Sequence, residues 1–138
     1  MLFHHRKEEM NLFSKLKEMK MLLIDDDELI RDSLMLFFEG EGCRLMACET
    51  AEEGLQALKG QCYDIIITDY LLPGMDGVEF CRRIRKTQPH AIKILITAYR
   101  NEGLVCEGIK AGIHDFIDKP FTTEAIERAL SRLIQERL

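Results

Sequence analysis

The sequence lacks an apolar run long enough to cross a bilayer, and it lacks a broad excess of basic residues. Its apolar runs, such as 21–24 and 65–67, fall far short of the roughly 20 residues that a membrane helix needs. A net charge of -5 argues against direct binding to nucleic acid. The first nine residues carry charges and two histidines rather than the apolar core of a secretory signal. We therefore expect a cytoplasmic protein that binds neither a membrane nor nucleic acid directly.

The cysteines form no pattern typical of a zinc site or a disulfide framework. They are odd in number and scattered, and no two of them make a C-x-x-C pair. A redox or metal site remains an alternative with little support from this spacing. We expect reduced thiols that pack as small hydrophobic side chains at Cys43, Cys48, Cys62, Cys81 and Cys106.

The length of 138 residues suits one packed domain, preceded here by a segment of different composition. Residues 1–19 hold more Lys and Arg than Glu, whereas residues 20–138 are acidic. Leu12, Phe13 and Leu16 have helical spacing and could dock on the domain or on a partner. We expect instead a frayed, solvated basic tail over 1–19, flexible or helical, and assign it no function.

From residue 20 onward, short apolar runs alternate with amphipathic stretches of helical period, which predicts βα units. Several runs are apolar nearly throughout, as is typical of a parallel sheet covered on both faces. The expected strands are 21–25, 43–48, 64–69, 92–97 and 114–118. The expected helices are 28–39, 51–59, 77–87, 101–111 and one from 122 onward. Asp27, Thr50 and Asp76 have the placing of helix N-caps. The sum is an α/β, (βα)5 fold with helices on both sides of an open sheet.

Polar residues fall where the expected strands end. Asp25 and Asp26 follow the first strand, Asp69 ends the third, Thr97 ends the fourth, and Lys119 follows the fifth. Because the carboxyl ends of parallel strands share one edge, these side chains should converge there. Neighbouring carboxylates raise one another's pKa unless a cation joins them. A hard divalent ion that keeps water and phosphate oxygens in its shell suits this edge, which favours phosphoryl chemistry.

Four segments around these residues resemble the signature blocks of response-regulator receiver domains of two-component signal transduction, in the chemotaxis-regulator-like superfamily. Each block alone is a weak signal, but all four keep the family's order and spacing. The resemblance covers residues 20–138 and implies a flavodoxin-like, doubly wound parallel sheet with strand order 2-1-3-4-5. The blocks read LLIDDD at 22–27, DYLLPGMDG at 69–77, ITA at 96–98 and KPF at 119–121.

The resemblance implies the chemistry of the first two blocks. Asp69 would take a phosphoryl group from the phosphohistidine of a sensor histidine kinase or phosphotransfer protein. Asp26, Asp69 and the backbone carbonyl of Leu71 would bind Mg²⁺ or Mn²⁺. Asp25 would act on the same ion through a bound water.

The resemblance also implies how phosphorylation becomes a signal. Lys119 would contact the phosphoryl oxygens, and Thr97 would donate a hydrogen bond to them. Thr97 would then move toward the phosphate, and Phe116 would enter the space it leaves; the alternative is that Phe116 is a fixed core residue. The output surface would be the fourth helix, fifth strand and fifth helix. A downstream effector protein, a domain absent from this chain, or a phosphorylation-dependent dimer would use it. The family usually has a cis peptide before Pro120.

Two bulky residues depart from the smaller ones expected near the acceptor. Leu71 and Tyr99 flank the route by which water would attack the acyl phosphate, so we hypothesise slow self-dephosphorylation. A phosphatase of the haloacid dehalogenase type needs a second aspartate two residues after the first, where this chain has Leu71. We therefore expect a signalling domain that assists only its own phosphorylation and dephosphorylation. The remaining alternative is a phosphate-independent docking module.

Overall fold

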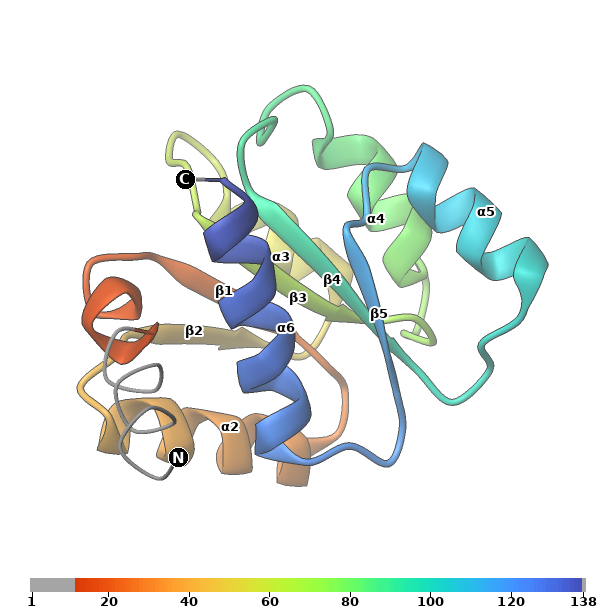
Figure 1. Cartoon of the computed structure of the whole chain (residues 1–138). Coiled ribbons are helices and arrows are strands. Elements are labelled where there is room, and N and C mark those ends of the chain that lie inside the picture. Colours follow the sequence, from red (N-terminus) through yellow and green to blue (C-terminus); the bar gives the residue numbers. More distant parts are fainter. Residues whose placement is uncertain (1–11, 138) are drawn as a thin grey trace.

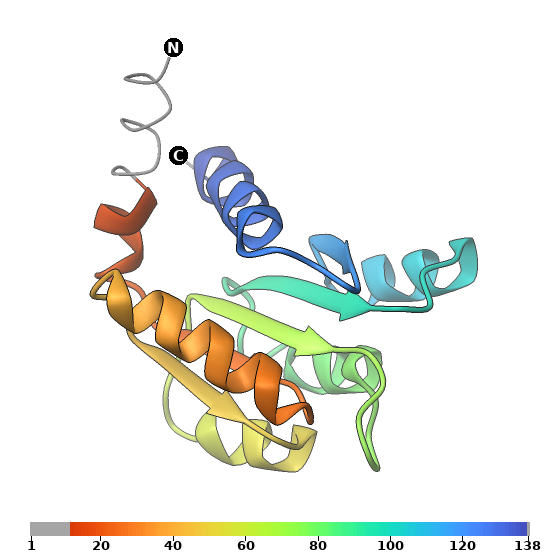
Figure 2. The ribbon, with the colours of Figure 1, turned by 90° about the horizontal axis from the view of Figure 1, so that it is seen from below.

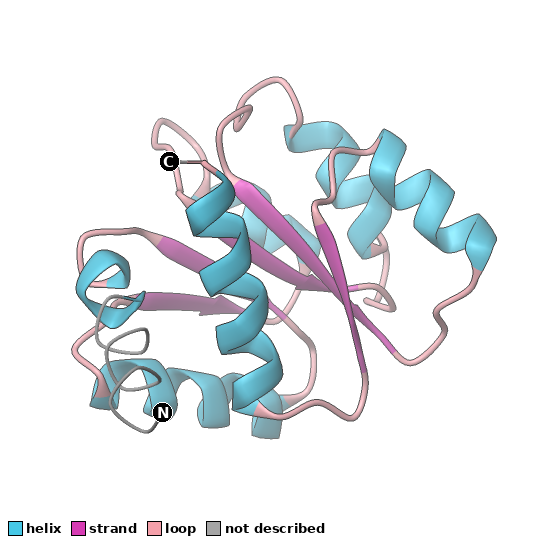
Figure 3. Ribbon diagram, in the orientation of Figure 1, coloured by secondary structure: helices cyan, strands magenta, loops and turns pink. Residues whose placement is uncertain are grey.

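The computed structural model describes residues 12–137 and contains one sheet of five parallel strands (Figures 1 and 3). The strand order is β2-β1-β3-β4-β5, which confirms the predicted fold and order. Within the described chain, no helix is both long enough and apolar enough to cross a membrane. The strands are β1 (Met21–Ile24), β2 (Leu45–Cys48), β3 (Ile65–Asp69), β4 (Ile92–Thr97) and β5 (Asp115–Asp118).

Five helices connect or follow the strands and cover both faces of the sheet. They are α2 (Glu28–Gly40), α3 (Ala51–Ala57), α4 (Gly77–Ile84), α5 (Glu102–Lys110) and α6 (Thr123–Glu136). In Figure 1, α6 crosses in front of the sheet and α3 lies behind it. Alternate strand residues supply the two cores because successive side chains point to opposite faces. Leu23 and Ile67 pack with α2 and α6, whereas Leu22 and Ile66 pack with α3, α4 and α5.

The helices begin where short polar side chains satisfy free backbone amides. As predicted, Asp27, Thr50 and Asp76 are the N-caps of α2, α3 and α4. The side chain of Asp76 accepts a hydrogen bond from the Glu79 amide at 2.9 Å. An N-cap of this kind stabilises a helix by about 1 kcal/mol. Asp27 and Thr50 come shortly after the ends of β1 and β2, so they help to fix these short loops at the carboxyl edge of the sheet.

The predicted start of the second strand is wrong by two residues. The amide of Cys43 donates to the carbonyl of Phe38 at 2.9 Å, so Cys43 belongs to the turn that closes α2. Gly42 makes this turn with a positive φ of 77°, a conformation that glycine adopts without steric cost. The strand begins only at Leu45, where pairing with Met21 starts.

The segment before β1 is packed rather than solvated. Residues 1–11 of the predicted tail lie outside the described residues; residues 12–16 form a short helix. Leu12 and Leu16 are buried in the core shared with α2 and α6, and the ring of Phe13 stands edge-on to Phe37 at 5.9 Å. In Figure 2 this helix lies beside the carboxyl end of α2. The expected frayed tail is thus wrong for residues 12–19, because their apolar side chains find an uncovered part of the core.

Candidate functional site

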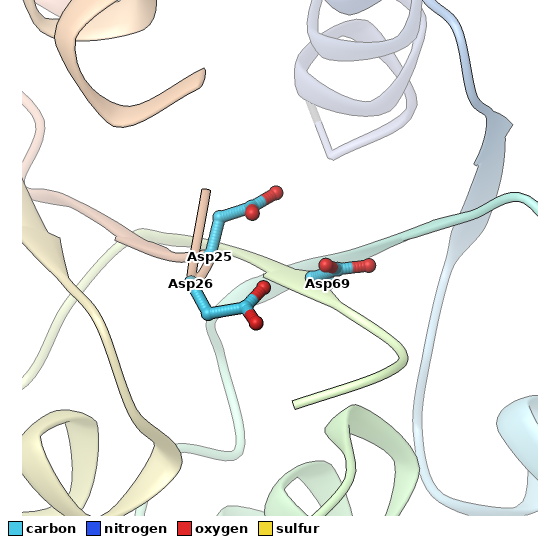
Figure 4. A group of neighbouring side chains, drawn as sticks. All are labelled: Asp25, Asp26 and Asp69. Carbon is cyan, nitrogen blue, oxygen red and sulfur yellow. The ribbon is translucent and has the colours of Figure 1, made fainter. Parts of the chain in front are cut away.

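Three carboxylates meet at the carboxyl edge of the sheet, as predicted. Asp25 and Asp26 follow β1, and Asp69 is the last residue of β3 (Figure 4). One oxygen from each carboxylate lies within 4.8 Å of the others. Asp25 is fully buried and Asp69 nearly so, whereas Asp26 is exposed. Two buried acids and one open one form a cluster that solvent reaches from one side.

Lys119 joins two of these carboxylates. Its Nζ donates a hydrogen bond to Oδ2 of Asp69 at 2.9 Å and lies 3.3 Å from Oδ2 of Asp25. The peptide bond between Lys119 and Pro120 is cis, as the resemblance implied. The backbone amide of Lys119 donates to the carbonyl of Thr97 at 2.9 Å, which ties the loop after β5 to the end of β4. Lys119 therefore reaches the acidic cluster from the end of β5, across β4, which lies between β5 and β3.

The charges at the site do not balance. Burial raises the pKa of Asp25, and the charge of Asp69 adds to this rise against the Asp27 amide and Lys119. Burial also raises the pKa of Asp69, with Asp26 adding to the rise and Lys119 opposing it. Burial alone would lower the pKa of Lys119, but its contacts with Asp69 and Asp25 raise it above the ordinary value. One ammonium thus faces two buried carboxylates whose ionised forms are disfavoured by burial and by neighbouring negative charge.

The donor set fits a divalent cation. Oδ2 of Asp25 is buried and makes no hydrogen bond within the described chain, although Lys119 lies at ion-pair distance. Hard ions such as Mg²⁺ take carboxylate and carbonyl oxygens as ligands. A cation would supply the missing positive charge and lower the pKa of Asp25 and Asp69 together. The cluster of Asp25, Asp26 and Asp69 therefore has the oxygen ligands, the burial and the charge deficit of a metal site.

Thr97 and Phe116, the predicted switch residues, are both buried. Oγ1 of Thr97 accepts a hydrogen bond from the amide of Tyr99 at 2.9 Å. Phe116 packs on α5, where a Cβ added to Gly108 would lie 2.6 Å from two atoms of its ring. The guanidinium of Arg100 lies 5.9 Å from the centre of the same ring, within cation-π range. The Phe116 ring thus extends from β5 and packs closely against α5.

The two bulky residues near the acceptor lie at the surface. The side chains of Leu71 and Tyr99 are 52% and 59% exposed, although both are apolar or aromatic. Tyr99 also lines a depression of about 460 Å³ between α4 and α5, together with Tyr70 and Leu104. Each follows a strand end by two residues, Leu71 after Asp69 of β3 and Tyr99 after Thr97 of β4.

The contacts of two residues of the site were not predicted from the sequence. A Cβ on Gly77 would lie 2.2 Å from the carbonyl oxygen of Asp69, so α4 approaches the acceptor more closely than a side chain allows. Nη1 of Arg31, on α2, donates to the carbonyl of Asp25 at 2.9 Å. A glycine at the first position of a helix and an arginine near the amino end of another were the available signals. Neither pattern alone shows which atom it approaches.

Comparison with known proteins identifies the family. Residues 21–131 match the family model of the response regulator receiver domain. The chain is 36% identical over 115 residues to the transcriptional regulatory protein AfsQ1 of Streptomyces coelicolor, covering 83% of this chain and 51% of that protein. It is 33% identical over 118 residues to the transcriptional regulatory protein ResD of Bacillus subtilis, covering 86% of this chain and 49% of that protein.

A solved structure gives the same result. The CheY-like receiver domain protein from Methanospirillum hungatei JF-1 aligns with a TM-score of 0.76 and 30% identity, covering 86% of this chain and 98% of that one. The chain belongs to the response regulator receiver domains, which confirms the resemblance read from the four sequence blocks. Members of this family are receiver domains of two-component systems that are phosphorylated on an aspartate. The chain spans about half the length of the two regulators named above.

Proposed function

We propose that this chain is a phosphorylation-dependent switch in which Asp69 is the phosphoacceptor. The observation that carries the proposal is the contact of Lys119 with both Asp69 and Asp25 at the edge of a three-carboxylate cluster. A carboxylate oxygen of Asp69 attacks the phosphorus of a phosphohistidine on a sensor kinase or phosphotransfer protein. An oxygen–phosphorus bond forms, and the phosphorus–nitrogen bond breaks with its electron pair left on the imidazole. The product is an acyl phosphate.

The cation ligands in this proposal are the carboxylates of Asp26 and Asp69 and the backbone carbonyl of Leu71, with Asp25 linked through water. Bound Mg²⁺ or Mn²⁺ would neutralise charge on the phosphoryl oxygens. Lys119 and Thr97 have the hydrogen-bond donors that the phosphoryl group would need. Lys119 lies 2.9 Å from the acceptor carboxylate and presents its remaining donors to an incoming phosphoryl group. The Thr97 hydroxyl, now accepting from Tyr99, can donate its own hydrogen to phosphate.

The signal leaves, in this proposal, through α5, β5 and α6. A dianion at Asp69 draws Thr97 toward it, and Phe116 responds because the two residues lie on neighbouring strands, β4 and β5. The close fit between Phe116 and Gly108 connects that movement to α5. Phosphorylation then shifts an equilibrium between two arrangements of this surface. A downstream effector protein, a domain beyond this chain or a second phosphorylated copy reads the shift, in the cytoplasm.

One experiment separates this function from its two rivals. The chain is incubated with Mg²⁺ and acetyl phosphate and its intact mass is measured. The proposal expects one added phosphoryl group on the wild type. None should form on Asp69→Ala, or on wild type when a chelator is present during the reaction. No added mass would support a phosphate-independent docking module. Rapid consumption of acetyl phosphate over many turnovers would support a hydrolase instead.

A further inference from the structure

We infer that Arg31 is a positioning residue for the cation site, acting through the peptide bond that joins Asp25 to Asp26. The inference rests on the proposed function of that site. Nη1 of Arg31 donates to the backbone carbonyl of Asp25 at 2.9 Å. The side chain reaches this carbonyl from α2, where Arg31 is half-buried.

The place of Arg31 in α2 calls for such a contact. The residue lies one turn from the amino end of the helix, where the helix dipole favours acidic side chains and disfavours basic ones. Half-burial of a long, flexible side chain adds a cost in rotamer entropy. A charge-assisted hydrogen bond to the Asp25 carbonyl offsets both costs. The guanidinium of Arg31 therefore lies at an unfavourable position in the helix, and its hydrogen bond to the Asp25 carbonyl compensates for this.

The carbonyl that Arg31 holds controls two metal-site residues at once. It belongs to the planar peptide between Asp25 and Asp26, so its direction sets the ψ angle of Asp25 and the φ angle of Asp26 together. The same turn is fixed at two further points. The Asp27 amide donates to Oδ1 of Asp25 at 2.9 Å, and Oδ1 of Asp27 accepts from the Leu29 amide at 2.9 Å. Without Arg31 the middle of this turn loses its side-chain anchor.

The geometric role predicts the opposite sign from a purely electrostatic one. Mg²⁺ demands near-ideal placing of its ligands, so a looser Asp25–Asp26 turn should weaken binding. A guanidinium acting only through its charge would repel the cation, and its removal would strengthen binding. The direction of the change in Mg²⁺ affinity therefore decides between the two roles.

The test is the Mg²⁺ dissociation constant of the full chain, measured by isothermal titration calorimetry. Arg31→Met should weaken binding roughly tenfold, as is typical when a group that orients a metal ligand is removed. Arg31→Lys keeps one donor and should lie between Arg31→Met and wild type. Arg83→Met, on the exposed face of α4, is the matched control and should bind within twofold of wild type. Unchanged or tighter binding by Arg31→Met overturns the inference.

Circular dichroism without Mg²⁺ shows which variants are folded. If Arg31→Met fails to fold, Arg31→Lys carries the test, and wild-type affinity in that variant overturns the inference. Wild type that binds no Mg²⁺ refutes the proposed function together with this inference. Wild type that binds Mg²⁺, with an affinity that Arg31→Met shares, refutes the role of Arg31 alone.

Discussion

Substitution of Gly77 by alanine should damage both stability and phosphorylation, because α4 begins against the backbone of the phosphoacceptor. The added Cβ would lie 2.2 Å from the Asp69 carbonyl oxygen, 2.9 Å from Cδ1 of Leu95 and 3.1 Å from the Asp69 carbonyl carbon. All but the leucine methyl are backbone atoms, so a shift of a rotamer cannot relieve the overlap. The amide of Gly77 also donates to the carbonyl of Tyr70 at 2.8 Å, which holds the helix in place.

The size of the effect follows from two opposing terms. Overpacking against backbone lies at the upper end of the usual range, about 3 kcal/mol. Alanine in place of glycine returns about 1 kcal/mol, because the unfolded chain loses less freedom. The net loss is about 2 kcal/mol, which lowers the melting temperature of a chain this size by roughly 6 to 8 °C. A displacement of the Asp69 backbone should also slow phosphorylation at least tenfold or so, since misplaced reacting groups are costly.

The assays are thermal unfolding and the rate of phosphorylation by acetyl phosphate. Gly40→Ala is the matched control, because nothing lies within 4 Å of its added Cβ and it ends a helix. That variant should be more stable than wild type by about 0.5 kcal/mol and should be phosphorylated at the wild-type rate. If Gly77→Ala has the same melting temperature as Gly40→Ala and is phosphorylated as fast as wild type, then α4 does not approach Asp69 as closely as described.

Three further predictions concern other parts of the chain. Leu16→Ala should lower the free energy of unfolding, measured by urea denaturation, by about 2 to 4 kcal/mol, because Leu16 is fully buried. The control Leu36→Ala should change it by less than about 0.5 kcal/mol, because Leu36 is 75% exposed. Equal effects of the two substitutions would refute the packing of residues 12–19. Partial desolvation and the nearby positive charges of Arg137 and Lys93 lower the pKa of His114 from 6.5. As the pH falls the unfolded chain therefore takes up a proton before the folded chain, and wild type should lose stability relative to His114→Asn between pH 7.5 and 5.5. A pH-independent difference in stability would contradict this. Leu71→Asn combined with Tyr99→Ala should shorten the lifetime of the phosphorylated chain, followed by intact mass after removal of acetyl phosphate; an unchanged lifetime refutes shielding by these side chains.

The fold could be predicted because several independent patterns agree. Apolar runs such as Ile65–Ile67 have the length and composition of buried parallel strands, and a helix cap follows each loop. Parallel strands place their carboxyl ends on one edge, so the sequence alone predicts that Asp25, Asp69 and Lys119 meet. The cap residues Asp27 and Asp76 were predictable because capping hydrogen bonds are local: their partners lie two or three residues further along the chain.

Contacts that depend on tertiary packing were not predictable. The pattern of Leu12 and Leu16 is compatible with a frayed tail, and only the space left beside α2 and α6 decides that these side chains are buried. The contact of Arg31 with the Asp25 carbonyl depends on the angle between α2 and β1, which no local pattern encodes. The close approach of Gly77 to Asp69 likewise depends on how α4 leaves the loop after β3.

The most direct test of the account is to identify the phosphorylated side chain. The chain is phosphorylated with acetyl phosphate in Mg²⁺, reduced with borohydride to convert an aspartyl phosphate to homoserine, and sequenced by tandem mass spectrometry. The account predicts homoserine at position 69 and a loss of this product when the cation is chelated. Homoserine at position 25 or 26, or equal labelling at position 69 without a cation, would contradict it.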